Sequence, residues 1–175
     1  MVTHDLNEAL LLADSMILIS QGQMLQQGAP FEVLSRPRNE AVARQMGLRN
    51  IFDGEVVFQD RTKDITWLKF GEQLIASDFG KDRSVGSKVR WVIPNQGIRF
   101  NAISNGRLCR SFNKLDVTID SLLVMGESVR VVCYATGTKL QLNTEVSFHL
   151  AQKLGLTKGM QTTVALKSEQ IHILE

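Results

Sequence analysis

The first fifty residues have the hydrophobic spacing of short helices around one hairpin. Apolar side chains recur at i, i+3, i+4 and i+7 within residues 6–13, which predicts an amphipathic helix. The preceding DLNE, residues 5–8, has the form of a capping box, so the helix should begin at Leu6. One face of this helix is apolar, and we expect it to need a packing partner.

A hairpin and two more helices are predicted after this helix. The run Met16–Ile19 is short, apolar and rich in branched side chains, and the Gln21-Gly22 turn follows it. Pro30 stands at a first helical position and begins a short helix. A second helix should run from an Asn39 cap to a stop at Gly47.

The rest of the chain changes to short β-runs divided by Gly, Asp and Asn, and these runs repeat. An offset of 66 residues aligns the early strands of two copies, for example Leu68 with Tyr134. Toward the ends of the copies the offset becomes 73, for example Ile93 with Leu166. The seven extra residues belong to FHLAQKLGL, residues 148–156, where the spacing predicts a short helix. Matched glycines and apolar positions on both sides of one gap favour duplication over chance similarity.

This pattern predicts a mainly β fold. Each copy offers about five strands, which suits a small Greek-key barrel of the oligonucleotide/oligosaccharide-binding (OB) type. We therefore expect a short α/β segment over residues 1–47. A first five-stranded barrel should span residues 48–112, and a second should span residues 113–175.

Composition restricts the class of protein. The chain has 175 residues, 43% hydrophobic content and 22% charged residues, which suits a globular protein with a real core. Its net charge is only +2 and it has no dense basic run, so charge does not indicate nucleic-acid binding. Cys109 and Cys133 lack metal-ligand spacing, and we expect them to be reduced thiols that act as small hydrophobes, with no metal bound. No apolar stretch approaches the length of a membrane span, so no direct membrane insertion is expected.

Three aromatic residues allow two interpretations. Trp67, Phe70 and Trp91 could stack on the bases of a single-stranded nucleic acid, as aromatic residues of such barrels do. They alternate with apolar positions in strand-like runs, however. The pattern therefore favours a place in the barrel cores or between the barrels.

The opening sequence MVTHDLNEALLLAD resembles the switch-histidine loop of ABC transporter ATPases, and about fifty residues resemble ABC importer ATPases with an extended C-terminus. The resemblance implies that His4 would contact the terminal phosphate of ATP and help to position the attacking water. These 175 residues contain no GxxxxGK(S/T) phosphate loop and no LSGGQ-like segment. We therefore expect no ATPase activity from this chain alone. ATP would bind only in a longer parent transport ATPase, whose catalytic parts would precede residue 1.

The β-region resembles the TOBE/Mop-like domains that follow the ATPase in many ABC importers. GLRNIFDGEV, residues 47–56, is similar to the SARNxLxGxV opening strand of molybdate-binding Mop domains, with Arg49, Asn50 and Gly54 matching. Only Asn113 and Leu115 of this pattern remain in the second copy. The segment TEVSFHLAQKLGLTKGM and the later VALKSEQIHI are similar to the second half of a Mop unit. The resemblance is more specific for the fold than for a ligand.

An oxyanion site needs several neutral donors that converge on a small concavity. The resemblance points to donors in both copies: Arg49, Asn50, Thr144, Ser147, Lys167 and Ser168. The possible ligands are molybdate, tungstate and sulfate. Pro94-Asn95 stands where the second copy has Lys167-Ser168, so two intact equivalent sites are not expected. The alternative for each residue is an ordinary turn or surface-strand role, and this alternative remains open.

Two functions fit these observations best. The first is a C-terminal regulatory and assembly module of an ABC importer ATP-binding subunit, for oxyanion uptake of the molybdate type. Its expected partners are a second copy of the chain, as a homodimer, and the membrane permease subunits at the cytoplasmic face. The alternative is a stand-alone cytosolic oxyanion-binding protein of the Mop type, which should have two well-formed sites.

Overall fold

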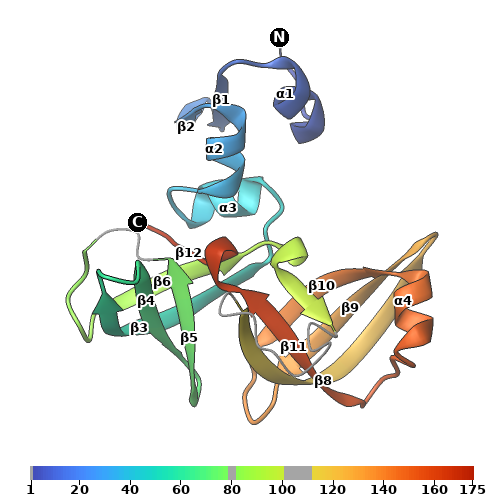
Figure 1. Ribbon diagram of the computed structural model, residues 1–175. Helices are drawn as coiled ribbons and strands as arrows, with labels where there is room; N and C mark the ends of the chain where they lie inside the picture. Colours follow the sequence, from blue (N-terminus) through green and yellow to red (C-terminus); the bar gives the residue numbers. More distant parts are fainter. Residues whose placement is uncertain (1, 79–81, 101–111) are drawn as a thin grey trace.

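The structure is a computed structural model, and it describes residues 2–78, 82–100 and 112–175. Figure 1 shows a small α/β segment above two β-sheets that lie side by side. The elements of the segment are α1 (Leu6–Leu12), β1 (Met16–Ser20), β2 (Gln23–Gly28), α2 (Pro30–Ser35) and α3 (Glu40–Gln45). The first copy contains β3 (Asn50–Asp60), β4 (Ile65–Phe70), β5 (Gln73–Asp78), β6 (Lys88–Ile93), the 3-10 turn η1 (Asn95–Gly97) and β7 (Ile98–Phe100). The second contains β8 (Phe112–Met125), β9 (Ser128–Ala135), β10 (Gln141–Ser147), α4 (Phe148–Lys153), β11 (Gln161–Lys167), η2 (Ser168–Gln170) and β12 (His172–Ile173).

The α/β segment forms as its local sequence predicts. The amide of Glu8 donates to Asp5 Oδ1 at 3.4 Å, so the capping residue at the start of α1 is used. Strands β1 and β2 pair as an antiparallel hairpin. The side chain of Asn39 caps α3, because its Oδ1 accepts a hydrogen bond from the Val42 amide at 3.0 Å. Short-range signals therefore determine this part of the fold.

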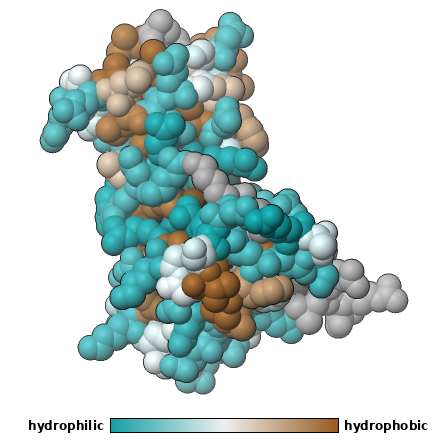
Figure 2. Space-filling model, turned by 90° about the vertical axis from the view of Figure 1, so that its left-hand side faces the viewer, coloured by the Kyte–Doolittle hydropathy of each residue, from teal (hydrophilic) through white to brown (hydrophobic). Residues whose placement is uncertain are grey.

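The apolar face of the segment is largely uncovered. Ala9 is buried, but several large apolar side chains are exposed by between 44% and 81%: Leu10, Leu11, Leu12, Ile17, Ile19, Met24 and Phe31. Figure 2 shows hydrophobic side chains gathered over this upper part of the molecule. We call these seven exposed residues the apolar face. A face of this kind on a folded protein indicates a surface that another polypeptide covers.

Each β-sheet takes one strand from the other copy. The sheet orders are β12-β6-β3-β4-β5 and β10-β9-β8-β11-β7, so both sheets have five strands and the same connectivity. Strand β7 of the first copy pairs with β11, and β12 of the second copy pairs with β6. The division at residues 112 and 113 separates the repeats along the sequence, whereas hydrogen bonding joins them through these two exchanged strands.

The registers correct the alignment of the two copies. The offset of 73 holds at the end, because Ile98 pairs with Leu166 in one sheet and the equivalent strands β12 and β6 pair in the other. The offset of 66 for the early strands is wrong. Asn50 pairs with Ile93 as Asn113 pairs with Leu166, which gives 63 for β3 and β8. Later pairings give 65 for β4 and β9, and 67 for β5 and β10. The single offset fails because both hairpin turns of the second copy are longer, and the insertion is distributed over three places.

One core joins both sheets. It contains buried residues of every strand from β3 to β11, and exclusion of their side chains from water is the main stabilising term. The Phe52, Phe70 and Trp91 rings pack with centroids 4.7 to 5.1 Å apart. Phe70 and Trp91 are 2% and 0% exposed, so they cannot be a surface stacking platform for bases. Trp67 is half-buried.

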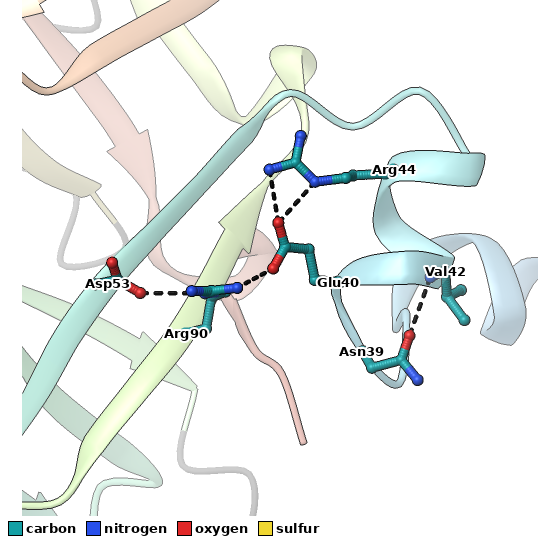
Figure 3. A network of polar contacts seen from close by, with 6 residues as sticks. All are labelled: Asn39, Glu40, Val42, Arg44, Asp53 and Arg90. Carbon is teal, nitrogen blue, oxygen red and sulfur yellow. Dashed lines mark hydrogen bonds and ion pairs between the residues drawn. The ribbon is translucent and has the colours of Figure 1, made fainter.

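Helix α3 docks the segment onto the first sheet. Ala43 packs in a small apolar cluster with Val92 and Leu174. Beside this cluster, Glu40 accepts from Arg44 at 2.6 Å and also pairs with Arg90, which reaches Asp53 at 3.1 Å (Figure 3). These charged groups are partly exposed, so the apolar cluster contributes more to docking than the ion pairs do. Among the described residues, no helix is long and apolar enough to cross a membrane.

Candidate functional site

Asn50 joins the first sheet to the edge of the second. It is fully buried, and its Oδ1 accepts from the Asn143 amide at 2.7 Å while its Nδ2 donates to the Asn143 carbonyl at 2.7 Å. The side-chain amide thus pairs with the free edge of β10 as a neighbouring strand would. This pairing satisfies edge groups that burial would otherwise leave without partners.

Thr144 completes the same cluster. It is fully buried, and its hydroxyl lies 3.3 Å from both the Asn95 and the Ile98 carbonyl oxygens. Asn50 also donates to Asn95 Oδ1 at 3.1 Å. The structure therefore brings Asn50 and Thr144, which are 94 positions apart in the chain, together around η1.

Asn113 forms the equivalent cluster in the other half of the molecule. Its Oδ1 accepts from the Ala76 amide at 2.7 Å, and its Nδ2 donates to the Ala76 carbonyl at 2.8 Å. Lys167 and Ser168 belong to this half, where η2 packs against β5. We call the two places the Asn50 cluster and the Asn113 cluster.

The two clusters differ in charge and closure. Lys167 pairs with Glu169, a carboxylate that has no acidic counterpart at η1. Nearby, burial raises the pKa of Asp78, and the negative charges of Asp64 and Glu169 raise it further. The Asn113 cluster is therefore bordered by carboxylates as well as by a lysine. The Asn50 cluster instead has buried amide and hydroxyl groups that bond to one another.

The remaining predicted residues lie elsewhere. Arg49 is exposed, next to Asn50 in the chain. Ser147 is also exposed, and its hydroxyl caps α4 by accepting from the Leu150 amide at 3.2 Å. His4 is exposed at the start of the α/β segment. The predicted ligand set is thus divided between two clusters, a helix cap and the surface.

Sequence reasoning did not identify the partners that each asparagine uses. Asn95, Asn143 and Ala76 were not predicted as site residues, and two of these contacts are made by backbone atoms. The signal that could have indicated the pairing was the occurrence of Asn50 and Asn113 at the same place in two copies. No local pattern shows which backbone a buried amide will meet.

Metal and thiol chemistry receive no support from the described residues. Within them, no group of three or more His, Cys, Asp or Glu side chains is placed to hold a metal ion. Cys133 is buried, and burial raises the pKa of its thiol to about 12, so it stays protonated. Cys109 lies outside the described residues.

Comparison with known proteins links the chain to two groups. No known protein-family profile matches it. It is 36% identical over 69 residues to the spermidine/putrescine import ATP-binding protein PotA of Clostridium novyi (strain NT). That match covers 39% of this chain and 20% of the relative, so the chain spans about a fifth of that protein.

The fold is similar to that of a solved molybdate-binding protein. The structure of the cytoplasmic molybdate-binding protein ModG, with molybdate bound, superposes with a TM-score of 0.62 at 17% identity. The match covers 72% of this chain and 95% of ModG. It confirms the mainly β fold with two five-stranded barrel-like sheets. At this identity it concerns the fold alone.

Proposed function

We propose that this chain is a regulatory and assembly module of an ABC importer ATP-binding subunit and has no ATPase activity by itself. The observation that carries the proposal is the 36% identity over 69 residues with an import ATP-binding protein. The chain has no phosphate loop of its own, so a parent transport ATPase would supply the nucleotide site. His4 would then act as the switch histidine only in that parent. The module would lie at the cytoplasmic face and meet the permease subunits there.

The apolar face supports an assembly role. It consists of large apolar side chains on α1, the hairpin and α2, which have no counterpart among the described residues to cover them. Apolar area of this kind is stabilised when a partner removes it from water. We propose that a second copy of the chain covers it when the module is alone. In the parent subunit the ATP-binding core would take that place.

Light scattering tests the pairing. The purified chain is expected to have the mass of two chains, and Leu11→Asp should shift it to the mass of one, because a buried carboxylate without a partner opposes association. The control is Leu123→Asp, which changes an exposed leucine on the second sheet. A wild-type monomer at all accessible concentrations would contradict the homodimer.

An oxyanion of the molybdate type is the ligand class that we propose for the Asn113 cluster. Lys167 provides a positive charge there and Ser168 a hydroxyl, beside the buried Asn113. The Lys167 ammonium is held by Glu169, so an incoming dianion would have to displace that carboxylate. The Asn50 cluster has no such cation, because Pro94 stands in the equivalent position. We therefore propose one oxyanion per chain rather than two.

Calorimetric titration with molybdate, tungstate, sulfate and ATP tests this ligand. We expect saturable binding of molybdate or tungstate, and no binding of ATP. Lys167→Ala should weaken binding at least tenfold, and Glu169→Gln should strengthen it by freeing the ammonium. Lys158→Ala is the matched control, because Lys158 is an exposed lysine on a turn of the same copy. If none of the oxyanions binds, the ligand proposal is wrong, and the assembly role is then judged from the light scattering.

A stand-alone oxyanion-binding protein is the second candidate. The observation that favours it is the 95% coverage of ModG by this fold. This candidate requires binding at both clusters, so the titration should give two oxyanions per chain. A stoichiometry of one favours the importer module.

A further inference from the structure

The last eight residues of the sequence connect all three parts of the molecule. We call residues 168–175 the strap. It leaves β11 in the second sheet through η2 and then pairs with β6 of the first sheet, with His172 opposite Val92. Beyond β12, the Glu175 amide donates to the Arg38 carbonyl at 2.8 Å. The strap thus starts in one copy, crosses the other and ends on the α/β segment.

Several independent contacts hold the strap on the segment. Leu174 is 3% exposed and packs with Ala43 of α3. The Arg38 side chain pairs with Glu175 at 3.4 Å. A cavity of about 860 Å³ lies between α2 and the strap, and His172 is among its lining residues. The segment and the first sheet are therefore joined by contacts on both sides of a solvent-filled space.

His172 is the titratable group at the centre of this junction. Its imidazole is half-buried and hydrogen-bonds to the Pro37 backbone, and since proline has no N–H the imidazole must donate to the carbonyl. Burial lowers the pKa of His172, and the positive charges of Arg36 and Arg83 lower it further, while the Pro37 bond and Glu175 oppose this. The other charged groups that line the same cavity are Glu32, Arg38, Asp64, Asp78 and Glu169.

We propose that the strap is a proton-sensitive clamp, which holds the α/β segment on the first barrel while His172 is neutral and loosens when His172 gains a proton. The geometry supports this because a second charge on the strap would lie in a half-buried site beside two arginines. The proposal goes beyond the module function and does not depend on it. It describes how docking of the segment is regulated.

The direction of the effect follows from linkage. Since the docked state has the lower pKa for His172, the undocked state binds more protons below the ordinary histidine value of about 6.5. Docking is therefore fully stabilised above that pH. It weakens as the pH falls from about 6.5 toward the lowered docked value, by at most about tenfold in the docking equilibrium per pH unit.

Hydrogen exchange of the whole chain at pH 7.5 and 5.5 tests the clamp. After correction for intrinsic exchange rates, protection of the Leu174 and Glu175 amides should fall several-fold at the lower pH. Amides of β9, such as that of Val131, should keep their protection, because they lie in the far sheet. In the same samples, NMR titration of the His172 imidazole should give a midpoint that coincides with the loss of protection.

Two histidine variants provide the control. His172→Gln keeps a hydrogen-bond donor but cannot titrate, so protection of the strap amides should become independent of pH. His149→Gln, at an exposed position on α4, should behave as the wild type does. An unchanged pH response in His172→Gln, or no response in the wild type, would overturn the proposal. If His172→Gln does not fold, a mismatch between the imidazole midpoint and the strap protection in the wild type would overturn it as well.

Discussion

Trp91→Ala is expected to lower the free energy of unfolding by about 3 to 5 kcal/mol, the largest single effect in this molecule. Trp91 is fully buried on β6, and its ring contacts the rings of Phe52 and Phe70. Truncation removes this apolar area and leaves a cavity that three neighbouring strands cannot fill without moving. Urea denaturation followed by far-ultraviolet circular dichroism measures the change.

The other tryptophan provides the control for this experiment. Trp67 is half-buried and pairs across strands with Phe58, which is 54% exposed. Trp67→Ala should cost about 1 kcal/mol, because solvent already reaches this ring. Since one core joins both sheets, each variant should still unfold in one transition. Equal costs for the two substitutions would show that Trp91 is not the centre of the core.

Asn113→Ala should have the second largest effect, a loss of about 2 to 4 kcal/mol. Its side chain bonds to both the amide and the carbonyl of Ala76 on the edge strand β5. Truncation leaves these two backbone groups without partners in a buried position. Asn50→Ala should cost a similar amount, because Asn50 makes the same pair of bonds to the backbone of Asn143. Thermal unfolding measures both.

Asn143→Ala is the matched control for these variants. Asn143 contributes its backbone to the cluster, and no hydrogen bond of its side chain is recorded among the described residues. Its replacement by alanine should therefore change the stability by less than about 1 kcal/mol. If Asn113→Ala costs no more than Asn143→Ala, water replaces the amide at the edge strand. The asparagine would then be free to serve a ligand rather than the fold.

These variants also distinguish a structural role from a binding role. In both clusters the asparagine amide already has backbone partners in the absence of any ligand. A ligand that used the same donors would have to displace strand-like hydrogen bonds, which opposes binding. Lys167 differs because its partner is a mobile carboxylate on an exposed residue. For this reason, the proposed oxyanion site depends on Lys167 more than on either asparagine.

Short-range signals in the sequence were sufficient for the local elements. The cap at Asp5, the hairpin over residues 16–28 and the cap at Asn39 depend on neighbours within a few residues, and the structure forms all three. The duplication was also visible, since equivalent strands need equivalent apolar positions. Its numerical alignment was less reliable because turns of unequal length change the offset without leaving a hydrophobic signal.

The sequence by itself determined the class of fold, the number of strands per copy and the helix inserted before the last strand of the second copy. Only the tertiary structure decided that β7 and β12 change places, that Asn50 meets Thr144 rather than Lys167, and that the strap reaches the α/β segment. The physical reason is the range of the interactions. Propensity, capping and alternation act between residues close in the chain. Strand exchange and buried amide pairing join backbone groups far apart, and any edge strand offers the same donors and acceptors until the fold selects one.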